Sequence, residues 1–224
     1  MRWALGIALA LFITVVPFVY YRISYTYQKR LRVVTADKLY RSGCMTAAGL
    51  EEAIKKHRIR TVINLMEEAP DPELKPHFFA PASIKESKLV ADLGARYVPM
   101  TVTYLPRNKA RTERPDTIER YLEILDNPLA YPVLVHCKAG LHRTGVLVAL
   151  YRMEYEGWSK EDALQELRDN GFGHFASTSA NEYVDQYVLR YQPHLRPGRT
   201  VERLPATKGN LVSRPGAFAP LPKD

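Results

Sequence analysis

The sequence has little cysteine, with only Cys44 and Cys137 among its 224 residues. Two cysteines far apart do not form the disulfide framework of a small secreted domain, so a reducing compartment is the simpler interpretation. The six histidines show no spacing typical of metal ligands, and we expect neither a metal nor a cofactor. The chain also lacks an internal repeat and any recognised nucleic-acid-binding motif, so we expect no nucleic-acid partner.

Acidic residues are in the minority, with 24 Asp and Glu against 32 Lys and Arg and a formal net charge of +8. This balance favours anionic partners such as a membrane surface or a phosphorylated substrate. A length of 224 residues suits one folded domain with appendages, and it is enough to bury a core.

A long uncharged run lies near the N-terminus, at residues 3–21. As a helix it would be about 28 Å long, close to the hydrocarbon thickness of a bilayer. The competing interpretation is a cleaved signal peptide, with Arg2 as its charged region and residues 4–16 as its apolar region. No small-residue cleavage site follows that region, so we favour an uncleaved transmembrane anchor over residues 1–21.

The next segment is basic: Arg22, Lys29, Arg30 and Arg32 occur with no acid among them. Basic residues beside a span orient that side toward the cytoplasm and attract anionic lipid. We therefore expect a single-pass membrane protein whose folded part faces the cytoplasm. Its predicted parts are the anchor (1–21), a basic juxtamembrane linker (22–35), a folded domain (36–191) and a disordered, Pro- and Arg-rich tail (192–224).

Strand and helix patterns alternate within the folded domain. Apolar, β-branched runs predict strands at residues 39–41, 61–65, 97–102 and 133–136. Start signals predict helices that open at Thr46, at a capping box of Ser83 and Glu86, and at Pro115, with further helices at 144–156, 160–169 and 180–191. The alternation predicts an α/β three-layer sandwich with a mainly parallel central sheet flanked by helices. In such sheets a ligand binds beyond the carboxyl ends of the strands.

The most informative stretch is residues 133–145, Val-Leu-Val-His-Cys-Lys-Ala-Gly-Leu-His-Arg-Thr-Gly. It predicts a buried strand, then a loop between Cys137 and Arg143, and then a helix that opens on Thr144. The successive N–H groups of such a loop and the positive end of the helix form a cradle for a tetrahedral dianion. Phosphate fits this description.

The side chains of the loop suggest what happens to a bound phosphate. The N–H groups, the helix dipole and Arg143 favour a charged sulfur at Cys137, which makes it the candidate nucleophile. Arg143 can hold two phosphate oxygens in a bidentate fork, and Thr144 can donate its hydroxyl to the sulfur. The predicted phosphate-binding residues are Lys138, Ala139, Gly140, Leu141, His142 and Arg143.

These residues carry a family resemblance. His136 and Cys137, followed by five residues and then Arg143, Thr144 and Gly145, resemble the signature of the cysteine-dependent protein tyrosine and dual-specificity phosphatases. Residues 39–43 (Leu-Tyr-Arg-Ser-Gly) and 61–65 (Thr-Val-Ile-Asn-Leu) resemble the compact, atypical branch found in bacteria, plants and fungi. The resemblance implies a dual-specificity phosphatase-like fold and hydrolysis of phosphotyrosine, phosphoserine or phosphothreonine through a cysteinyl-phosphate.

The general acid is the equivocal part of the motif. The resembled family usually supplies an Asp about thirty residues before its Cys, where it protonates the leaving oxygen. The corresponding window, residues 104–111, contains no carboxylate. Asp116 and Glu113 are the candidates, although an acid in the first turn of a helix is also favoured by the helix dipole alone. A substrate that needs no acid remains the third alternative.

That third alternative bears on the substrate. An inositol pyrophosphate is an anhydride with a good leaving group, and the loop resembles those of pyrophosphoinositide phosphatases and of phosphoinositide lipid phosphatases. Both have Lys where this chain has Leu141. A non-catalytic, membrane-tethered phosphate-binding module is a further alternative, as is a sulfur transferase of the rhodanese kind.

Several residues near the motif have simpler structural interpretations. We expect His136 to brace the loop rather than act as a base, and Cys44 to be a small packing residue rather than a redox partner of Cys137. Glu67, Glu68 and Asp71 either reach the rim of the site and bind Arg143 or belong to a solvated loop, and the solvated loop is the favoured interpretation.

Overall fold

The structure is a computed structural model that describes residues 2–77, 80–101, 115–173 and 185–194. The chain divides into two compact units, Met1–Pro193 and His194–Asp224. Only His194 of the second unit is described, so the account below concerns the first. Glu113, the last residue of the strand predicted at 97–102, the start of the helix predicted at 180–191 and nearly all of the predicted tail lie outside the described residues.

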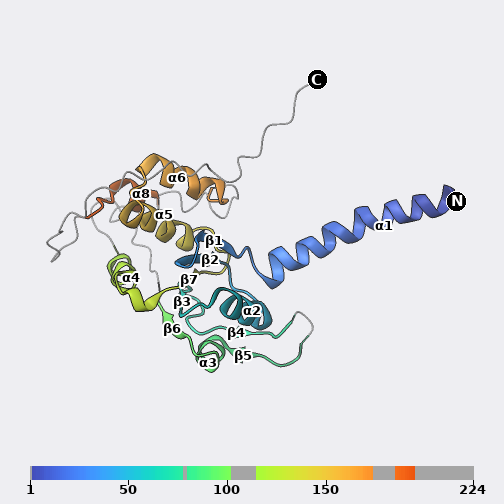
Figure 1. Ribbon diagram of the computed structural model, residues 1–224, viewed down its shortest axis with the longest axis horizontal. Helices are drawn as coiled ribbons and strands as arrows, with labels where there is room; N and C mark the ends of the chain where they lie inside the picture. The colour runs from blue at the N-terminus through green and yellow to red at the C-terminus, as the bar shows by residue number, and fades with distance from the viewer. Residues whose placement is uncertain (1, 78–79, 102–114, 174–184, 195–224) are drawn as a thin grey trace, which may run out of the picture. The chain divides into compact units, whose positions relative to one another are not determined.

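A five-stranded sheet with the order β1-β2-β7-β3-β6 forms the centre of the fold (Figure 1). Its strands are β1 (Arg32–Thr35), β2 (Leu39–Ser42), β3 (Thr61–Asn64), β6 (Arg96–Pro99) and β7 (Val133–His136). The pairs β2–β7, β7–β3 and β3–β6 are parallel, whereas β1 pairs antiparallel to β2. The sheet is therefore mixed, with its parallel part around β7.

The register of the parallel strands positions the end of β7. His136 is opposite Ser42 of β2 and Asn64 of β3. The strands thus end level with one another, and the residue after His136 is Cys137. The expected location of the motif beyond the carboxyl ends of the strands is confirmed.

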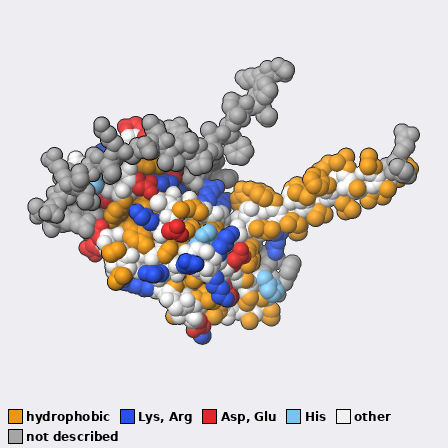
Figure 2. Space-filling view, in the orientation of Figure 1, with side chains coloured by type: hydrophobic (Ala, Val, Ile, Leu, Met, Phe, Trp, Pro, Cys, Tyr) orange, Lys and Arg blue, Asp and Glu red, His pale blue; other side chains and the backbone are white. Residues whose placement is uncertain are grey.

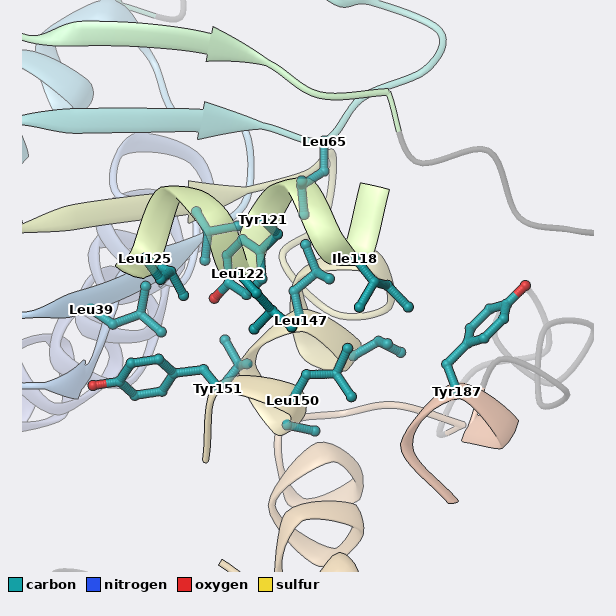
Figure 3. Close-up of a cluster of buried hydrophobic side chains, with 14 of the residues drawn as sticks. Leu39, Leu65, Ile118, Tyr121, Leu122, Leu125, Leu147, Leu150, Tyr151 and Tyr187 are labelled. Atoms are coloured by element: carbon teal, nitrogen blue, oxygen red, sulfur yellow. The ribbon is translucent and has the colours of Figure 1, made fainter. Parts of the chain in front are cut away.

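Helices cover both faces of the sheet. Their bounds are α2 (Ala47–His57), α3 (Glu86–Asp92), α4 (Asp116–Asp126), η2 (Pro128–Ala130), α5 (Arg143–Tyr155), α6 (Lys160–Asp169) and α8 (Asp185–Arg190). Leu39 and Val135 belong to one core with residues of α4, α5, α6 and α8, a part of which Figure 3 shows. Tyr40 and Leu134, their neighbours in sequence, belong to a second core with α2 and α3. Because side chains alternate along a strand, the sheet lies between two helical layers.

Local signals placed several helices correctly. The Thr46 hydroxyl accepts a hydrogen bond from Gly49 N at 3.2 Å, and the Ser159 hydroxyl accepts one from Asp162 N at 3.0 Å. Each side chain therefore caps its helix as predicted. Pro115 precedes α4, whose buried face includes Tyr121.

The capping box predicted for α3 is wrong. The residue before the helix is Lys85, which makes no side-chain cap. Ser83 instead donates to Glu73, 2.9 Å away. This contact lies in a two-stranded hairpin, β4 (Glu73–Leu74) and β5 (Ile84–Lys85), which the sequence did not predict. The carboxylate of Glu86 is also used elsewhere, in the core.

The segment interpreted as a linker contains regular structure. A π-helix, η1 (Arg22–Tyr27), follows the N-terminal helix, and β1 then joins the central sheet. The turn between them places two non-glycine residues in the left-handed region, Lys29 with φ 42° and Arg30 with φ 58°.

The N-terminal helix, α1 (Arg2–Tyr21), continues into η1. The stretch Trp3–Tyr27 is long and apolar enough to cross a membrane: an 18-residue window within it has a mean hydropathy of 2.2, and none of that window is buried within the protein. Figure 2 shows hydrophobic side chains along the helix. A signal sequence near an N-terminus has the same properties, so the helix is a candidate span.

Candidate active site

The loop of residues 137–142 connects β7 to α5 and is built around Gly140. Gly140 has φ 74°, in the left-handed region that favours glycine. A Cβ at this position would lie 2.5 Å from the backbone C and O of Ser42. The loop therefore packs against the end of β2 at a distance that only glycine permits.

The backbone of the loop faces the cysteine sulfur. Cys137 is buried, with 4% of its surface exposed. The N–H of Gly140 donates to Cys137 Sγ at 3.2 Å. The sulfur of Cys137 therefore lies within hydrogen-bonding distance of a backbone donor of the loop.

Three successive carbonyls of the loop accept hydrogen bonds from donors outside it. Lys138 O accepts from Cys44 N at 3.2 Å, Ala139 O from Arg30 Nη1 at 3.0 Å, and Gly140 O from Arg41 Nη2 at 2.8 Å. Burial lowers the pKa of Arg41 to about 10. Neither Arg30 nor Arg41 was singled out for the site from the sequence, although Arg41 lies in the Leu-Tyr-Arg-Ser-Gly stretch.

Arg143, the first residue of α5, is bound by acidic residues that follow β3. Its Nη1 donates to Glu68 Oε2 at 2.9 Å and to the carbonyl of Leu65 at 3.3 Å, and its Nη2 lies 3.7 Å from Glu67 Oε2. The hydrogen bond from Arg143 lowers the pKa of Glu68. For these two glutamates the favoured interpretation as a solvated loop is wrong, because both reach the guanidinium. Asp71 binds elsewhere, accepting bonds from the N–H and hydroxyl of Ser87 at 3.0 Å.

A buried contact between His136 and Glu86 holds the residue at which the loop begins. His136 Nε2 lies 2.6 Å from Glu86 Oε1, and the two side chains are 3% and 1% exposed. The carbonyl of His136 also accepts from Leu65 N at 2.8 Å. His136 is thus fixed by α3 and by the residue after β3, which agrees with its expected bracing role. Glu86 was missed, because its partner is 50 positions away.

The remaining predicted site residues are arranged as follows. Lys138 is exposed, Ala139 is partly exposed and Leu141 is buried. His142 contacts the ring of Phe172 edge-on, with 5.7 Å between centroids, and its pKa is lowered by burial and then by the neighbouring Arg143.

Two predicted catalytic side chains make no contact with the sulfur that the structure records. Thr144 is fully buried, and its hydroxyl has no hydrogen-bond partner within the described part of the chain. Asp116 is the first residue of α4 and is exposed. Glu113 is not among the described residues. Across residues 2–77, 80–101, 115–173 and 185–194, no cluster of His, Cys, Asp or Glu could hold a metal ion.

Cys44 contributes its backbone rather than its thiol. Its N–H binds Lys138 O, while burial raises the pKa of the thiol to about 12. Both cysteines are free. A thiol that resists ionisation is a poor partner for disulfide exchange, so the packing interpretation of Cys44 fits the structure.

A cysteine loop between a parallel strand and a helix, on a mixed sheet flanked by helices, defines the α/β phosphatase fold. The chain belongs to the tyrosine phosphatase family, whose model matches residues 29–202. The resemblance noted in the sequence is therefore confirmed.

Part of the sequence is similar to those of two phosphatases. The dual specificity protein phosphatase TpbA of Pseudomonas aeruginosa is 36% identical over 75 residues, which are 34% of this chain and 34% of TpbA. The inositol diphosphatase DSP3 of Arabidopsis thaliana is 30% identical over 134 residues, 60% of this chain and 59% of DSP3. The matches thus span less than two thirds of either relative.

Two solved structures share the fold. The crystal structure of P. aeruginosa TpbA has a TM-score of 0.53 with 22% sequence identity, covering 72% of this chain and 84% of that one. The core catalytic domain of the PP-IP phosphatase SIW14 from S. cerevisiae has a TM-score of 0.52 with 19% identity, covering 72% and 85%.

Proposed function

We propose that this chain removes phosphate from a phosphorylated substrate by nucleophilic catalysis at Cys137. The observation that carries the proposal is the hydrogen bond from Gly140 N–H to Cys137 Sγ at 3.2 Å. It sets the sulfur at the centre of a loop whose N–H groups suit a phosphate dianion. Membership of the tyrosine phosphatase family supports the same reaction.

The proposed reaction has two steps, both at Cys137. The phosphate of the substrate binds to the loop backbone and to the guanidinium of Arg143. The thiolate of Cys137 attacks phosphorus, so that an S–P bond forms while the bond from phosphorus to the leaving oxygen breaks. Water then attacks the cysteinyl-phosphate, which breaks the S–P bond, releases inorganic phosphate and restores the thiolate. Thr144 is the proposed donor to the departing sulfur.

The ion pairs of Arg143 affect the binding step. In the structure its guanidinium is bound by Glu68 at 2.9 Å. A phosphate dianion must share or replace that contact, because both anions use the same N–H donors. Glu68 therefore weakens phosphate binding. The effect on binding free energy is small, because the Glu68 side chain is 48% exposed and water screens its charge.

The proton for the leaving oxygen has two candidate sources, Asp116 and Glu113. Asp116 is the residue of choice because it begins the helix that follows the 102–114 segment, and Glu113 is the second candidate. The lowered pKa of Glu68 makes this third carboxyl a poor acid, since a general acid must hold a proton near neutral pH. A good leaving group would need no acid.

We propose phosphorylated protein as the substrate, with phosphotyrosine, phosphoserine or phosphothreonine as the group cleaved. The second candidate substrate is an inositol pyrophosphate or a phosphoinositide. The match to an inositol diphosphatase over 60% of the chain favours it. A non-catalytic phosphate-binding module is the remaining alternative.

We further propose that α1 anchors the protein in a membrane as a single-pass segment over residues 1–21, with a basic segment at 22–35. The phosphatase domain at 36–191 then faces the cytoplasm. The apolar composition of Trp3–Tyr27 supports the anchor, and Arg22, Lys29, Arg30 and Arg32 support the orientation.

The test compares phosphate release by the full chain and by Cys137→Ser on three substrates, namely a phosphotyrosine peptide, a phosphoinositide in vesicles and an inositol pyrophosphate. We expect turnover that depends on Cys137. Turnover of the pyrophosphate alone would favour the second candidate. Phosphate binding without turnover of any substrate would favour the binding module and contradict the proposal.

A further inference from the structure

The donors that hold the loop carbonyls decide where the loop N–H groups point. A trans peptide is planar, and its C=O and N–H groups point in opposite directions. The carbonyls of Lys138, Ala139 and Gly140 are all directed to donors outside the loop. The N–H groups of the three following residues must therefore point away from those donors, and one of them, on Gly140, is bonded to the sulfur.

One of these N–H groups can be checked in the structure. The carbonyl of Ala139 accepts from Arg30, and the N–H of the same peptide, on Gly140, donates to Cys137 Sγ. The two hydrogen bonds lie at opposite edges of one planar peptide group. Arg30 thus fixes the peptide that contacts the nucleophile, although its own side chain does not touch the sulfur.

Arg30 is the unusual member of the set because it comes from the segment that follows the N-terminal helix. Cys44 and Arg41 lie in or directly after β2, next to the loop. Arg30 instead reaches Ala139 across 109 positions of sequence. Its guanidinium also lies over the ring of Tyr25, 5.0 Å from the centroid, so one side of the guanidinium stacks in its own segment.

Several contacts hold Arg30 in this position. Arg30 N donates to Ser24 O at 2.7 Å, and Lys29 O accepts from Gly43 N at 2.7 Å. Lys29 and Arg30 both have positive φ, a conformation that is unfavourable for residues other than glycine. A turn with that cost persists only when surrounding contacts compensate it, and such turns are common at functional sites.

From these contacts we infer that Arg30 is a positioning residue for catalysis, so that the basic segment after the N-terminal helix completes the phosphate cradle. Arg30 holds the Ala139–Gly140 peptide with its N–H directed at the thiolate and at the bound phosphate. The segment at 22–31 is thereby part of the active-site structure as well as a connection. The inference rests on the proposed phosphatase function for its effect on turnover, but not for its effect on phosphate binding.

The test uses the full chain with three substitutions. Arg30→Met keeps the length of the side chain and removes its donors, Arg30→Lys keeps a charge and one donor, and Arg32→Met is the matched control. Arg32 carries the same charge two residues away, is exposed, and donates to Asn170 rather than to the loop. Four quantities are measured for each: kcat and KM on p-nitrophenyl phosphate, the dissociation constant of inorganic phosphate, and the melting temperature.

We expect Arg30→Met to weaken phosphate binding and to lower kcat/KM by roughly tenfold, which is the range for one charge-assisted hydrogen bond. Arg30→Lys should recover part of both losses, and Arg32→Met should stay within about twofold of the wild type. A purely structural role would lower the melting temperature while leaving phosphate affinity unchanged.

Two results would overturn the inference. One is wild-type phosphate binding by Arg30→Met, and the other is an equal loss in Arg32→Met, which would assign the effect to net charge. Absence of turnover in the wild type would contradict the proposed function alone, because the comparison of phosphate dissociation constants tests the role of Arg30 without turnover.

Discussion

Removal of the Glu86 carboxylate should destabilise the protein severely. Glu86 and His136 form a hydrogen-bonded pair at 2.6 Å with both side chains almost fully buried. Glu86→Ala leaves the ring of His136 without this partner in the interior, beside the start of the cysteine loop. The other oxygen of Glu86 and the Nδ1 of His136 have no hydrogen-bond partner within the described residues, so no neighbour there is ready to replace the lost contact.

The expected magnitude follows from the burial. Breaking a buried pair by removing one partner costs about 3–5 kcal/mol, because the other polar group stays buried and unpaired. For a domain of this size each kcal/mol lowers the melting temperature by about 2–4 °C. Glu86→Ala should therefore melt roughly 6–20 °C below the wild type.

The assay is thermal unfolding followed by circular dichroism, with two comparison variants. Glu86→Gln keeps the volume and an oxygen that can accept from His136, so it should lose less than half as much stability. Lys88 lies on the same helix and forms an exposed ion pair with Asp92 at 2.8 Å. Lys88→Ala removes only this pair, so it should change the free energy of unfolding by about 0.5 kcal/mol or less. A melting temperature for Glu86→Ala within about 3 °C of the wild type would refute the reasoning.

Three further predictions concern the loop and its neighbours. Glu68→Gln should tighten the binding of inorganic phosphate by up to about fivefold, because it removes the anion that competes for Arg143; calorimetric titration measures this. Gly140→Ala should abolish phosphate binding and turnover, because strain of about 1–2 kcal/mol at positive φ is added to a clash with the Ser42 backbone at 2.5 Å; the same titration and a kinetic assay test it. Burial holds the pKa of His142 below 6.5 in the folded state, so the unfolded chain binds its proton first, and the stability contributed by His142 is lost as the pH falls through about 6.5. When the pH is lowered from about 7.5 to about 5.5, the melting temperature of His142→Gln should accordingly fall by less than that of the wild type.

Matched substitutions control these three experiments. Glu73→Gln removes an exposed carboxylate that pairs with Lys85 at 3.7 Å and should leave phosphate affinity unchanged. Gly94 has the same φ of 74° as Gly140, but a Cβ there would meet no atom within 4 Å, so Gly94→Ala should lose stability and keep activity. His77→Gln changes an exposed histidine and should follow the wild-type pH dependence. Equal behaviour of a variant and its control would contradict the corresponding prediction.

The sequence was informative where structure depends on neighbouring residues. The caps at Thr46 and Ser159 use hydrogen bonds across three positions, and periodic apolar residues identified the buried face of α4. The loop from Cys137 to Arg143 was also recognisable, because its N–H groups, its glycine and its arginine are contiguous in the chain. Such features do not depend on how distant segments pair.

Contacts between distant segments were either missed or, for Glu68 and Arg143, left as the less favoured interpretation. Glu86 matched a local capping pattern, yet its carboxylate binds His136 in the interior. Glu68 reaches Arg143 only because β3 and β7 are neighbours in the sheet. Arg30 belongs to a basic stretch that the sequence analysis assigned to membrane orientation and lipid attraction. No neighbouring residue indicated that its side chain binds the carbonyl of Ala139. In each case the partner is set by the order of the strands.

The most direct test of the central claim is to trap the covalent intermediate. The full chain is mixed with substrate, quenched with acid during turnover and digested, and the peptide containing Cys137 is examined by mass spectrometry. Our account predicts that this peptide gains the mass of one phosphoryl group, and that the gain is absent in Cys137→Ser. Turnover at the wild-type rate by Cys137→Ser, or a phosphoryl group found on another residue, would contradict the account.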